Sequence, residues 1–173
     1  MSESTATRPG GDVIPPRDPA SEEGAQALAE RVVGGMLAAD AFSRWLGIEV
    51  LQIAPRRCVA RMTVRAEMCN GFGICHGGVT FSLADSAFAF ACNTHGSVTV
   101  ALDDSISYAA PVQVGDVLTV TAQADLAPKR VGFFRATIVN QRNEIVALFR
   151  GTGYDTRRPH LLHDLPARAG ADS

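Results

Sequence analysis

The stretch NGFGICHGGVTFSLADSAFAFACN, residues 70–93, decides the fold of this chain. From Val79 to Cys92 every residue is apolar or small except Asp85, which carries the only charge. A helix that is apolar on all sides belongs in the middle of a fold, because it has no face to present to water. The sequence therefore predicts a long central helix over residues 77–93 with one carboxylate inside it.

This carboxylate indicates a functional site. An ionised Asp85 in an apolar helix is costly unless it is paired or has a chemical role. Just before the helix, His76-Gly77-Gly78 leaves backbone N–H groups without intrahelical acceptors, at the positive end of the helix dipole. A lone acid together with a potential oxyanion site predicts an active site. The alternative is a structural acid held by the hydroxyls of Ser82, Ser86 or Ser105.

The rest of the chain predicts an α+β architecture. Ser21 is a candidate N-cap for a first helix, and Asp40 caps a short continuation that ends at Gly47. The segments with strand-like patterns are residues 47–54, 57–65, 97–108, 116–127, 131–141 and 144–154. A long apolar helix followed by four strands and preceded by two favours the hot-dog fold, a curved antiparallel sheet wrapped around a long central helix. We expect one domain over residues 21–155, a flexible leader over 1–20 and a flexible tail over 156–173.

Composition excludes several classes of protein. The 173 residues carry a net charge of −2, so nothing favours binding to nucleic acid or to a membrane surface. The four cysteines form no C-x-x-C pair and no secretory segment is recognisable, which predicts reduced thiols and a cytoplasmic location. Cys69, Cys75 and His76 lack a fourth ligand at a recognisable spacing, so we expect no metal and no cofactor.

Several motifs together resemble the PaaI-type hot-dog acyl-CoA thioesterases of phenylacetic acid degradation. The resemblance covers roughly residues 36 to 153. Its motifs are Asn70-Gly71, Cys75-His76-Gly77-Gly78, Phe81–Asp85, Phe88–Asn93, Gly115-Asp116, Ile138–Gln141 and Val146–Gly151.

The resemblance implies a function and roles for four residues. It implies hydrolysis of aryl- or (hydroxy)phenylacetyl-CoA-like thioesters by a hot-dog homodimer, often paired into a tetramer. Asp85 matches the catalytic acid of the family, and Gly77 matches the residue whose backbone N–H polarises the thioester carbonyl. Asn70 matches a polar residue of the active-site loop, with His76 beside it.

For two of these residues a simpler role stays open. His76 can order the loop before the helix, and Asn70 can cap a turn beside Gly71. Some relatives carry a serine on the strand after the helix that helps to hold the water. Ala101 stands at that position here, which makes Ser86 the substitute candidate.

Helix geometry bears on the assembly. Asp85 lies eight residues beyond Gly77, which separates the two by about 12 Å along one helix. One carbonyl carbon cannot reach both, so we expect each site to combine Gly77, Asn70 and His76 of one subunit with Asp85 of the other, across a two-fold axis. Asp85 then acts either as a general base on water or as a nucleophile that forms a mixed anhydride.

The phosphates of coenzyme A require cations near the site. Lys129 and Arg130, on a predicted turn, are one candidate pair, and Arg157-Arg158 is the other.

Two other functions fit the sequence less well. An acyl-CoA-binding module has no need of Asp85, and a hot-dog enoyl-CoA hydratase needs a histidine near the acid, whereas His95 falls beyond the expected helix end. Asp103 and Asp104 receive no role from the sequence.

Overall fold

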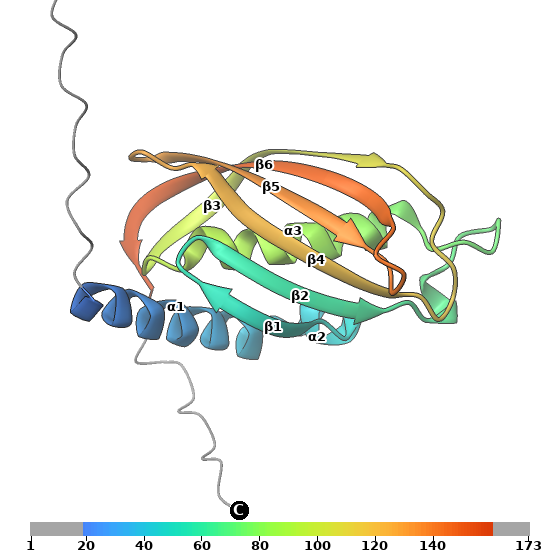
Figure 1. Cartoon of the computed structure of the whole chain (residues 1–173), viewed down its shortest axis with the longest axis horizontal. Helices are drawn as coiled ribbons and strands as arrows, with labels where there is room; N and C mark the ends of the chain where they lie inside the picture. The colour runs from blue at the N-terminus through green and yellow to red at the C-terminus, as the bar shows by residue number, and fades with distance from the viewer. Residues whose placement is uncertain (1–18, 161–173) are drawn as a thin grey trace, which may run out of the picture.

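A six-stranded antiparallel sheet curves around one long helix, α3, in the computed structural model (Figure 1). The structure describes residues 19–160, and their side chains from Ser21 onward. In chain order the elements are α1 (Pro19–Ala39), α2 (Ala41–Leu46), β1 (Glu49–Ala54), β2 (Arg57–Thr63), a 3₁₀ turn at Ala66–Met68, α3 (Gly77–Asn93), β3 (Ser97–Tyr108), β4 (Val117–Leu126), β5 (Val131–Val139) and β6 (Ile145–Pro159). This is the predicted hot-dog fold.

The strand order is β1-β2-β4-β5-β6-β3, so β1 and β3 form the two edges of the sheet. The last strand is longer than the sequence indicated. β6 continues past residue 155 because its last residues pair with the first residues of β3. Ser97 of β3 pairs with Pro159. β6 therefore includes four residues, 156–159, that the sequence assigned to the tail. Residues 1–18 of the predicted leader and 161–173 of the predicted tail lie outside the described residues.

The core lies between α3 and the concave face of the sheet. Leu83, Ala87 and Phe88 of α3 are fully or almost fully buried there. The ring of Phe88 meets Phe134 of β5 and Phe149 of β6, with centroids 5.4 and 5.6 Å apart. The prediction of an enclosed central helix is therefore confirmed for the side of α3 that faces the sheet. There the alanines let the backbones approach and the phenylalanines fill the remaining space.

The opposite side of α3 is less enclosed than the all-apolar pattern suggested. Ser82, Asp85, Ser86 and Ala89, which recur at helical spacing, are all half-buried. The helices α1 and α2 pack against α3 but leave this stripe partly open. The carboxylate of Asp85 therefore lies at a partly covered surface of the single chain.

The short helix α2 is fixed beside this stripe by its cap. Asp40 accepts hydrogen bonds from the backbone N–H groups of Phe42 and Ser43, as a capping residue should, and Gly47 ends the helix with φ 76°. The hydroxyl of Ser43 also donates to Asp40 at 2.5 Å and lies 2.9 Å from the hydroxyl of Ser86. These contacts link α2 to α3 one residue beyond Asp85.

Candidate active site

The loop before α3 presents one free backbone donor. His76 is the N-cap of α3, and its Nδ1 accepts a 2.9 Å hydrogen bond from the N–H of Gly78. The carbonyl of His76 accepts a second bond from Val79. Within the described part of the chain, the N–H of Gly77 has no acceptor. This N–H, at the positive end of a seventeen-residue helix, can stabilise an oxyanion.

Tyr108, at the end of β3, fixes this glycine, although no sequence pattern indicated such a role. Its hydroxyl donates a 2.8 Å hydrogen bond to the carbonyl of Gly77. A Cβ at position 77 would lie 3.0 Å from both Cζ and the hydroxyl oxygen of Tyr108. Position 77 therefore has room for glycine alone unless the ring moves. Desolvation raises the pKa of Tyr108, so the phenol stays a donor at neutral pH.

A groove of about 390 Å³ opens beside Gly77 and Tyr108. It continues past Asn70, and its remaining lining is mostly apolar: Ile74, Cys75, Thr80, Ala109, Ala110, Pro111, Val112 and Val146. Such a lining suits an acyl group whose carbonyl points at the helix N-terminus.

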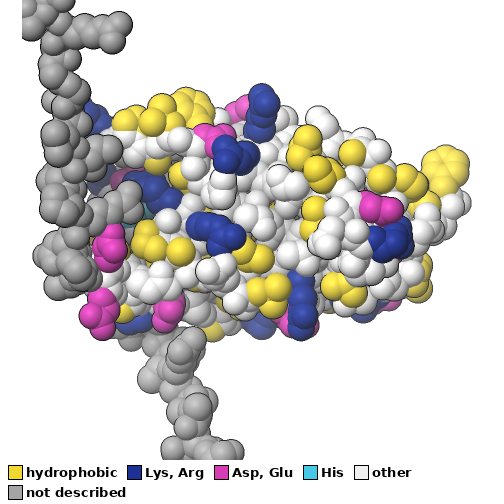
Figure 2. Space-filling model, viewed as in Figure 1, with side chains coloured by type: hydrophobic (Ala, Val, Ile, Leu, Met, Phe, Trp, Pro, Cys, Tyr) yellow, Lys and Arg dark blue, Asp and Glu magenta, His cyan; other side chains and the backbone are white. Residues whose placement is uncertain are grey.

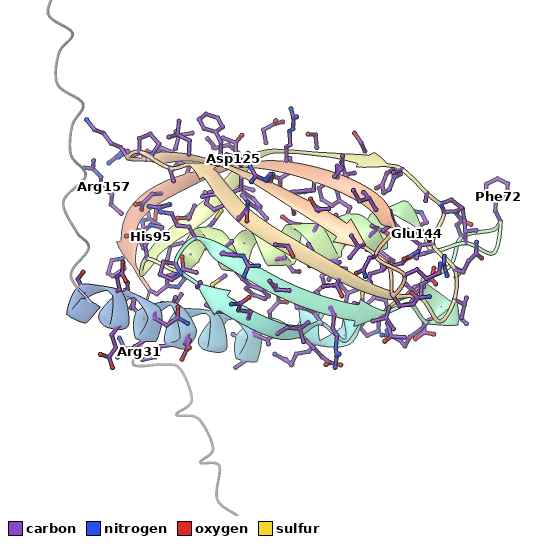
Figure 3. All side chains as sticks on the ribbon, viewed as in Figure 1. Arg31, Phe72, His95, Asp125, Glu144 and Arg157 are labelled. Carbon is purple, nitrogen blue, oxygen red and sulfur yellow. The ribbon has the colours of Figure 1, made fainter. Side chains whose placement is uncertain are left out.

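Asn70 orders the loop that borders this groove. Its Oδ1 accepts a 2.9 Å hydrogen bond from the N–H of Phe72, and its carbonyl accepts one from Gly73. The turn-capping role is therefore present, and the same residue also faces the groove. Phe72, at the tip of the loop, is 90% exposed and projects from one end of the molecule (Figure 3).

Asp85 is half-buried on α3, and no hydrogen bond to it occurs among the described residues. Burial raises its pKa, and the negative charge of Asp40 raises it further. Two of the hydroxyls expected to satisfy a structural acid are engaged elsewhere. Ser82 donates to the carbonyl of Gly78 at 2.8 Å, and Ser86 contacts Ser43. The arrangement suits a carboxylate that acts as a base.

One chain does not bring this acid and the free N–H together. Gly77 begins α3 and Asp85 lies two turns further on, about 12 Å along the axis. The groove beside Gly77 includes neither Asp85 nor Ser86 in its lining.

The predicted phosphate ligands lie at the other end of α3. Lys129 and Arg130, in the turn between β4 and β5, surround a small pocket with Cys92 and His95. Arg130 donates to the hydroxyl of Tyr154 at 2.7 Å. Figure 3 places His95 and Arg157 at the end of the molecule opposite Phe72. In a single chain these cations are therefore remote from Gly77.

His95 is also separated from the acid that a hydratase would pair with it. It follows the end of α3 and contacts Asp155 of β6, with 3.3 Å between Nε2 and Oδ2. Asp155, rather than Asp85, is the carboxylate beside this imidazole. This geometry does not suit a hydratase.

Other classes of site are not visible in the described residues. Between residues 19 and 160, no three His, Cys, Asp or Glu side chains gather in a way that could hold a metal ion. No helix in that range has the length and apolar character to cross a membrane. Lys and Arg side chains are spread over the face drawn in Figure 2 rather than gathered in one patch.

The sequence and the fold match those of known proteins. The model of the thioesterase superfamily matches residues 72–147. The acyl-coenzyme A thioesterase PaaI of Escherichia coli (strain K12) is 45% identical over 115 residues, which are 66% of this chain and 82% of that protein. Human acyl-coenzyme A thioesterase 13 is 33% identical over 119 residues, 67% of this chain and 84% of that protein.

Solved structures show the same relationship. The structure of the E. coli PaaI protein from the phenylacetic acid degradation operon superimposes with a TM-score of 0.76 at 40% identity, covering 78% of this chain and 98% of that one. A mutant of the phenylacetic acid degradation protein PaaI from Thermus thermophilus gives a TM-score of 0.65 at 37% identity, over 67% and 99% of the two chains.

The chain therefore belongs to the thioesterase superfamily, with the hot-dog fold. Within that superfamily it is a PaaI-like acyl-CoA thioesterase, an enzyme that hydrolyses the thioester bond of an acyl-CoA.

Proposed function

We propose that this enzyme hydrolyses aryl- or (hydroxy)phenylacetyl-CoA-like thioesters to the free acid and CoA. The relatives from phenylacetic acid degradation and the mostly apolar groove beside Gly77 support this substrate class. The groove has a volume of about 390 Å³, which accommodates an aromatic ring with a short side chain.

The free N–H of Gly77 carries the proposal. In the mechanism it donates to the thioester carbonyl oxygen as negative charge develops there, and a donor of this kind is typically worth about 3 kcal/mol. The N-cap bond of His76 and the Tyr108 hydroxyl on the Gly77 carbonyl hold the donor in place. Asn70 closes the loop at the same groove. In this proposal His76 and Asn70 shape the site, and neither transfers a proton.

Besides stabilisation of the oxyanion, hydrolysis requires an activated nucleophile, and Asp85 supplies it. Its raised pKa strengthens it as a general base on water, although direct attack to form a mixed anhydride uses the same residue. Ser86, tied to Ser43, holds the neighbouring turn against α2. Because Asp85 cannot reach the carbonyl held by Gly77 of its own chain, a second subunit must bring it there.

The free edge of the sheet supports such a homodimer. No strand among the described residues pairs with the outer side of β3, and two of its large apolar residues, Val100 and Leu102, are 47% and 60% exposed. An unprotected apolar edge favours pairing with another chain. Pairing β3 with β3 about a two-fold axis sets two α3 helices side by side and antiparallel. We propose shared sites in this dimer and its further pairing into a tetramer in the cytoplasm.

The same two-fold arrangement gives the distant cations a role. It brings the C-terminal end of one α3 toward the N-terminal end of its partner. Lys129 and Arg130 of one subunit then serve the CoA phosphates of a substrate bound at the other. Arg157 and Arg158, at the same end of β6, are the alternative pair.

A panel of aromatic and aliphatic acyl-CoAs, assayed by release of free thiol, tests the activity. We expect aryl and phenylacetyl thioesters to give the highest kcat/KM, and Asp85→Ala to lose at least about a hundredfold. A loss below about tenfold would remove Asp85 from the mechanism. A preference for long aliphatic chains would refute the substrate class.

Mixed dimers test the shared sites. As homodimers, Asp85→Ala and Gly77→Ala chains are expected to lose at least about a hundredfold and about tenfold in kcat/KM, respectively. Refolded together, their heterodimers carry one doubly altered site and one intact site, so activity returns. Mixtures that exchange subunits yet stay inactive would show that each site lies within one chain.

A further inference from the structure

Two cysteines face each other across the base of the loop that precedes α3. Cys69 and Cys75 form an isolated antiparallel bridge, and residues 70–74 make up the loop between them. Both thiols are free. Cys69 is half-buried, whereas Cys75, with an exposed fraction of 6%, lines the groove beside Gly77. An oxidant can therefore reach one thiol, and the other stands directly opposite it.

Backbone hydrogen bonds fix how the two cysteines oppose each other. The N–H of Asn70 donates to the carbonyl of Ile74, and the N–H of His76 donates to the carbonyl of Met68, both at 2.8 Å. Because these bonds flank the bridge, the cysteines are a non-hydrogen-bonded pair, with Cα atoms about 4.5 Å apart and side chains on the same face. A disulfide requires Cα atoms roughly 4.4 to 6.8 Å apart. The backbone therefore already has a spacing that allows the bond.

The present contacts of the two sulfurs are weak. Sγ of Cys69 lies 3.9 Å from the carbonyl oxygen of Arg65, and Sγ of Cys75 lies 3.9 Å from the hydroxyl of Thr80. A thiol is a poor donor and a poor acceptor, so little is lost when the side chains rotate toward each other. Burial raises the pKa of Cys75, and the charge of the neighbouring Cys69 also raises it. Cys69 is therefore the thiol that reacts first.

The other two cysteines are unsuited to oxidation. Cys58 of β2 and Cys92 of α3 are both buried in the core. Burial raises the pKa of Cys58 to about 12 and raises that of Cys92 as well. Because the thiolate is the reactive form, both thiols stay inert at neutral pH.

We propose that Cys69 and Cys75 are a redox-active pair, in which a hydroperoxide oxidises Cys69 and Cys75 then closes a disulfide across the base of the loop. The bond cross-links the loop that carries Asn70 and Phe72, one residue before His76 caps α3. In a reducing compartment such a disulfide forms transiently and opens again by exchange with a thiol reductant. This inference goes beyond the proposed hydrolysis and does not depend on it.

Atoms and electrons balance in two steps. The thiolate of Cys69 attacks one oxygen of the hydroperoxide and the O–O bond breaks, which leaves a sulfenic acid on Cys69. The departing alkoxide takes up the proton that the Cys69 thiol released and becomes an alcohol. The sulfur of Cys75 then attacks the sulfenic sulfur, the S–O bond breaks, and hydroxide leaves with the proton of Cys75 as water. Two electrons pass from the two sulfurs to the peroxide.

Mass spectrometry of the full chain tests the bond. Reduced enzyme is treated with hydrogen peroxide, quenched with catalase and then unfolded in iodoacetamide. We expect the loss of two hydrogen atoms, with Cys58 and Cys92 alkylated and the other pair protected. Chymotrypsin cuts after Phe72, which is 90% exposed, and the two fragments should separate only when a reductant is added. Four alkylated thiols, or a disulfide between two chains, would overturn the inference.

Variants test the order of the two steps. Cys75→Ser should keep oxygen on Cys69, because no second thiol resolves the sulfenic acid, and Cys69→Ser should stay unoxidised. Cys58→Ala is the matched control and should form the bond as the wild type does. Oxidation of Cys75 in Cys69→Ser at the wild-type rate would refute the order. If either serine variant fails to fold, the peptide map of the wild type still decides whether the bond forms.

The rate of native-state cleavage at Phe72 measures the effect on the loop. A cross-link restricts the opened state, so oxidation should slow this cleavage at least about threefold in the wild type. Cys69→Ser should be cut at the same rate with and without peroxide. Equal rates for oxidised and reduced wild type would show that the bond does not hold the loop. Asp85→Ala should form the bond normally, so this result stands or falls apart from the proposed mechanism of hydrolysis.

Discussion

The carboxylate of Asp104 on β3, whose Oδ1 is buried and makes no hydrogen bond among the described residues, should destabilise the folded enzyme above pH 6, and Asp104→Asn should relieve this. The pKa of Asp104 is raised from 3.8 to about 6 in the folded protein, first by burial and then by Asp85. An acid with a raised folded pKa binds its proton more tightly when folded. Its stabilising contribution is complete below about pH 4 and is lost as the pH rises through about 6.

The size of the effect follows from the two values. A rise from 3.8 to about 6 corresponds to at most about 3 kcal/mol of unfolding free energy. Solvent reaches part of the half-buried side chain, which lowers the expected figure to about 1.5 kcal/mol. Asparagine has no charge to lose. The stability of Asp104→Asn relative to the wild type should therefore increase by about 1.5 kcal/mol between about pH 4 and about pH 7.5.

Urea unfolding at both pH values measures this difference, with the fluorescence of Trp45, the single tryptophan, and circular dichroism as probes. Protein concentration is held fixed because association shifts apparent stability. Comparing two pH values cancels any packing cost of asparagine that does not depend on pH. Asp103→Asn, on the exposed neighbour, should show a smaller change, because the charge of Asp103 contributes least to the raised pKa of Asp104. If the wild type and Asp104→Asn differ equally at both pH values, the carboxylate is not strained as described.

Three further outcomes are expected. Gly77→Ala should lower kcat/KM at least about tenfold, because its Cβ meets the Tyr108 ring at 3.0 Å and displaces the backbone N–H of residue 77. Gly71→Ala, whose Cβ enters open space, should not lower it. Equal activity of the two variants in the thiol-release assay would contradict the role of the Gly77 N–H. His76→Ala should lower the unfolding free energy by about 1 kcal/mol through loss of the cap, and His76→Asp should retain stability and activity; an inactive but stable His76→Asp would instead make the imidazole catalytic. Replacing Lys129 and Arg130 by alanine should raise KM for acyl-CoA and weaken its dependence on salt while kcat holds; an unchanged KM would direct attention to Arg157 and Arg158.

Much of the fold was predictable because its signals are local. The helix predicted over residues 77–93 has those boundaries, since a histidine cap, two glycines and an unbroken apolar run define it without help from the rest of the chain. Asp40 and Gly47 bound α2 for the same reason. The length of β6 was underestimated, because its last residues, among them Arg157 and Arg158, look like a polar tail and are strand only through pairing with β3.

The candidate site likewise combines residues marked by local signals with residues placed by contacts between distant segments. Gly77, His76 and Asp85 could be proposed from the sequence, because a helix N-terminus and a lone acid in an apolar helix are visible in a few consecutive residues. The contacts of Tyr108 with Gly77 and of Asp104 with Gly151 join residues separated by 31 and 47 positions. Such contacts depend on the register between strands, which the alternation of apolar and polar residues along one strand cannot specify.

The amino-acid sequence by itself determined that one central helix carries a lone acid and begins at a histidine–glycine N-terminus, because local propensity and charge placement fix both. Only the tertiary structure decided which groups surround them. The curl of β3 over α3 places the phenol of Tyr108 on Gly77 and buries an oxygen of Asp104 beside Gly151. That arrangement arises from the packing of distant segments, and burial there is the main reason that the pKa values of Asp85 and Asp104 are raised.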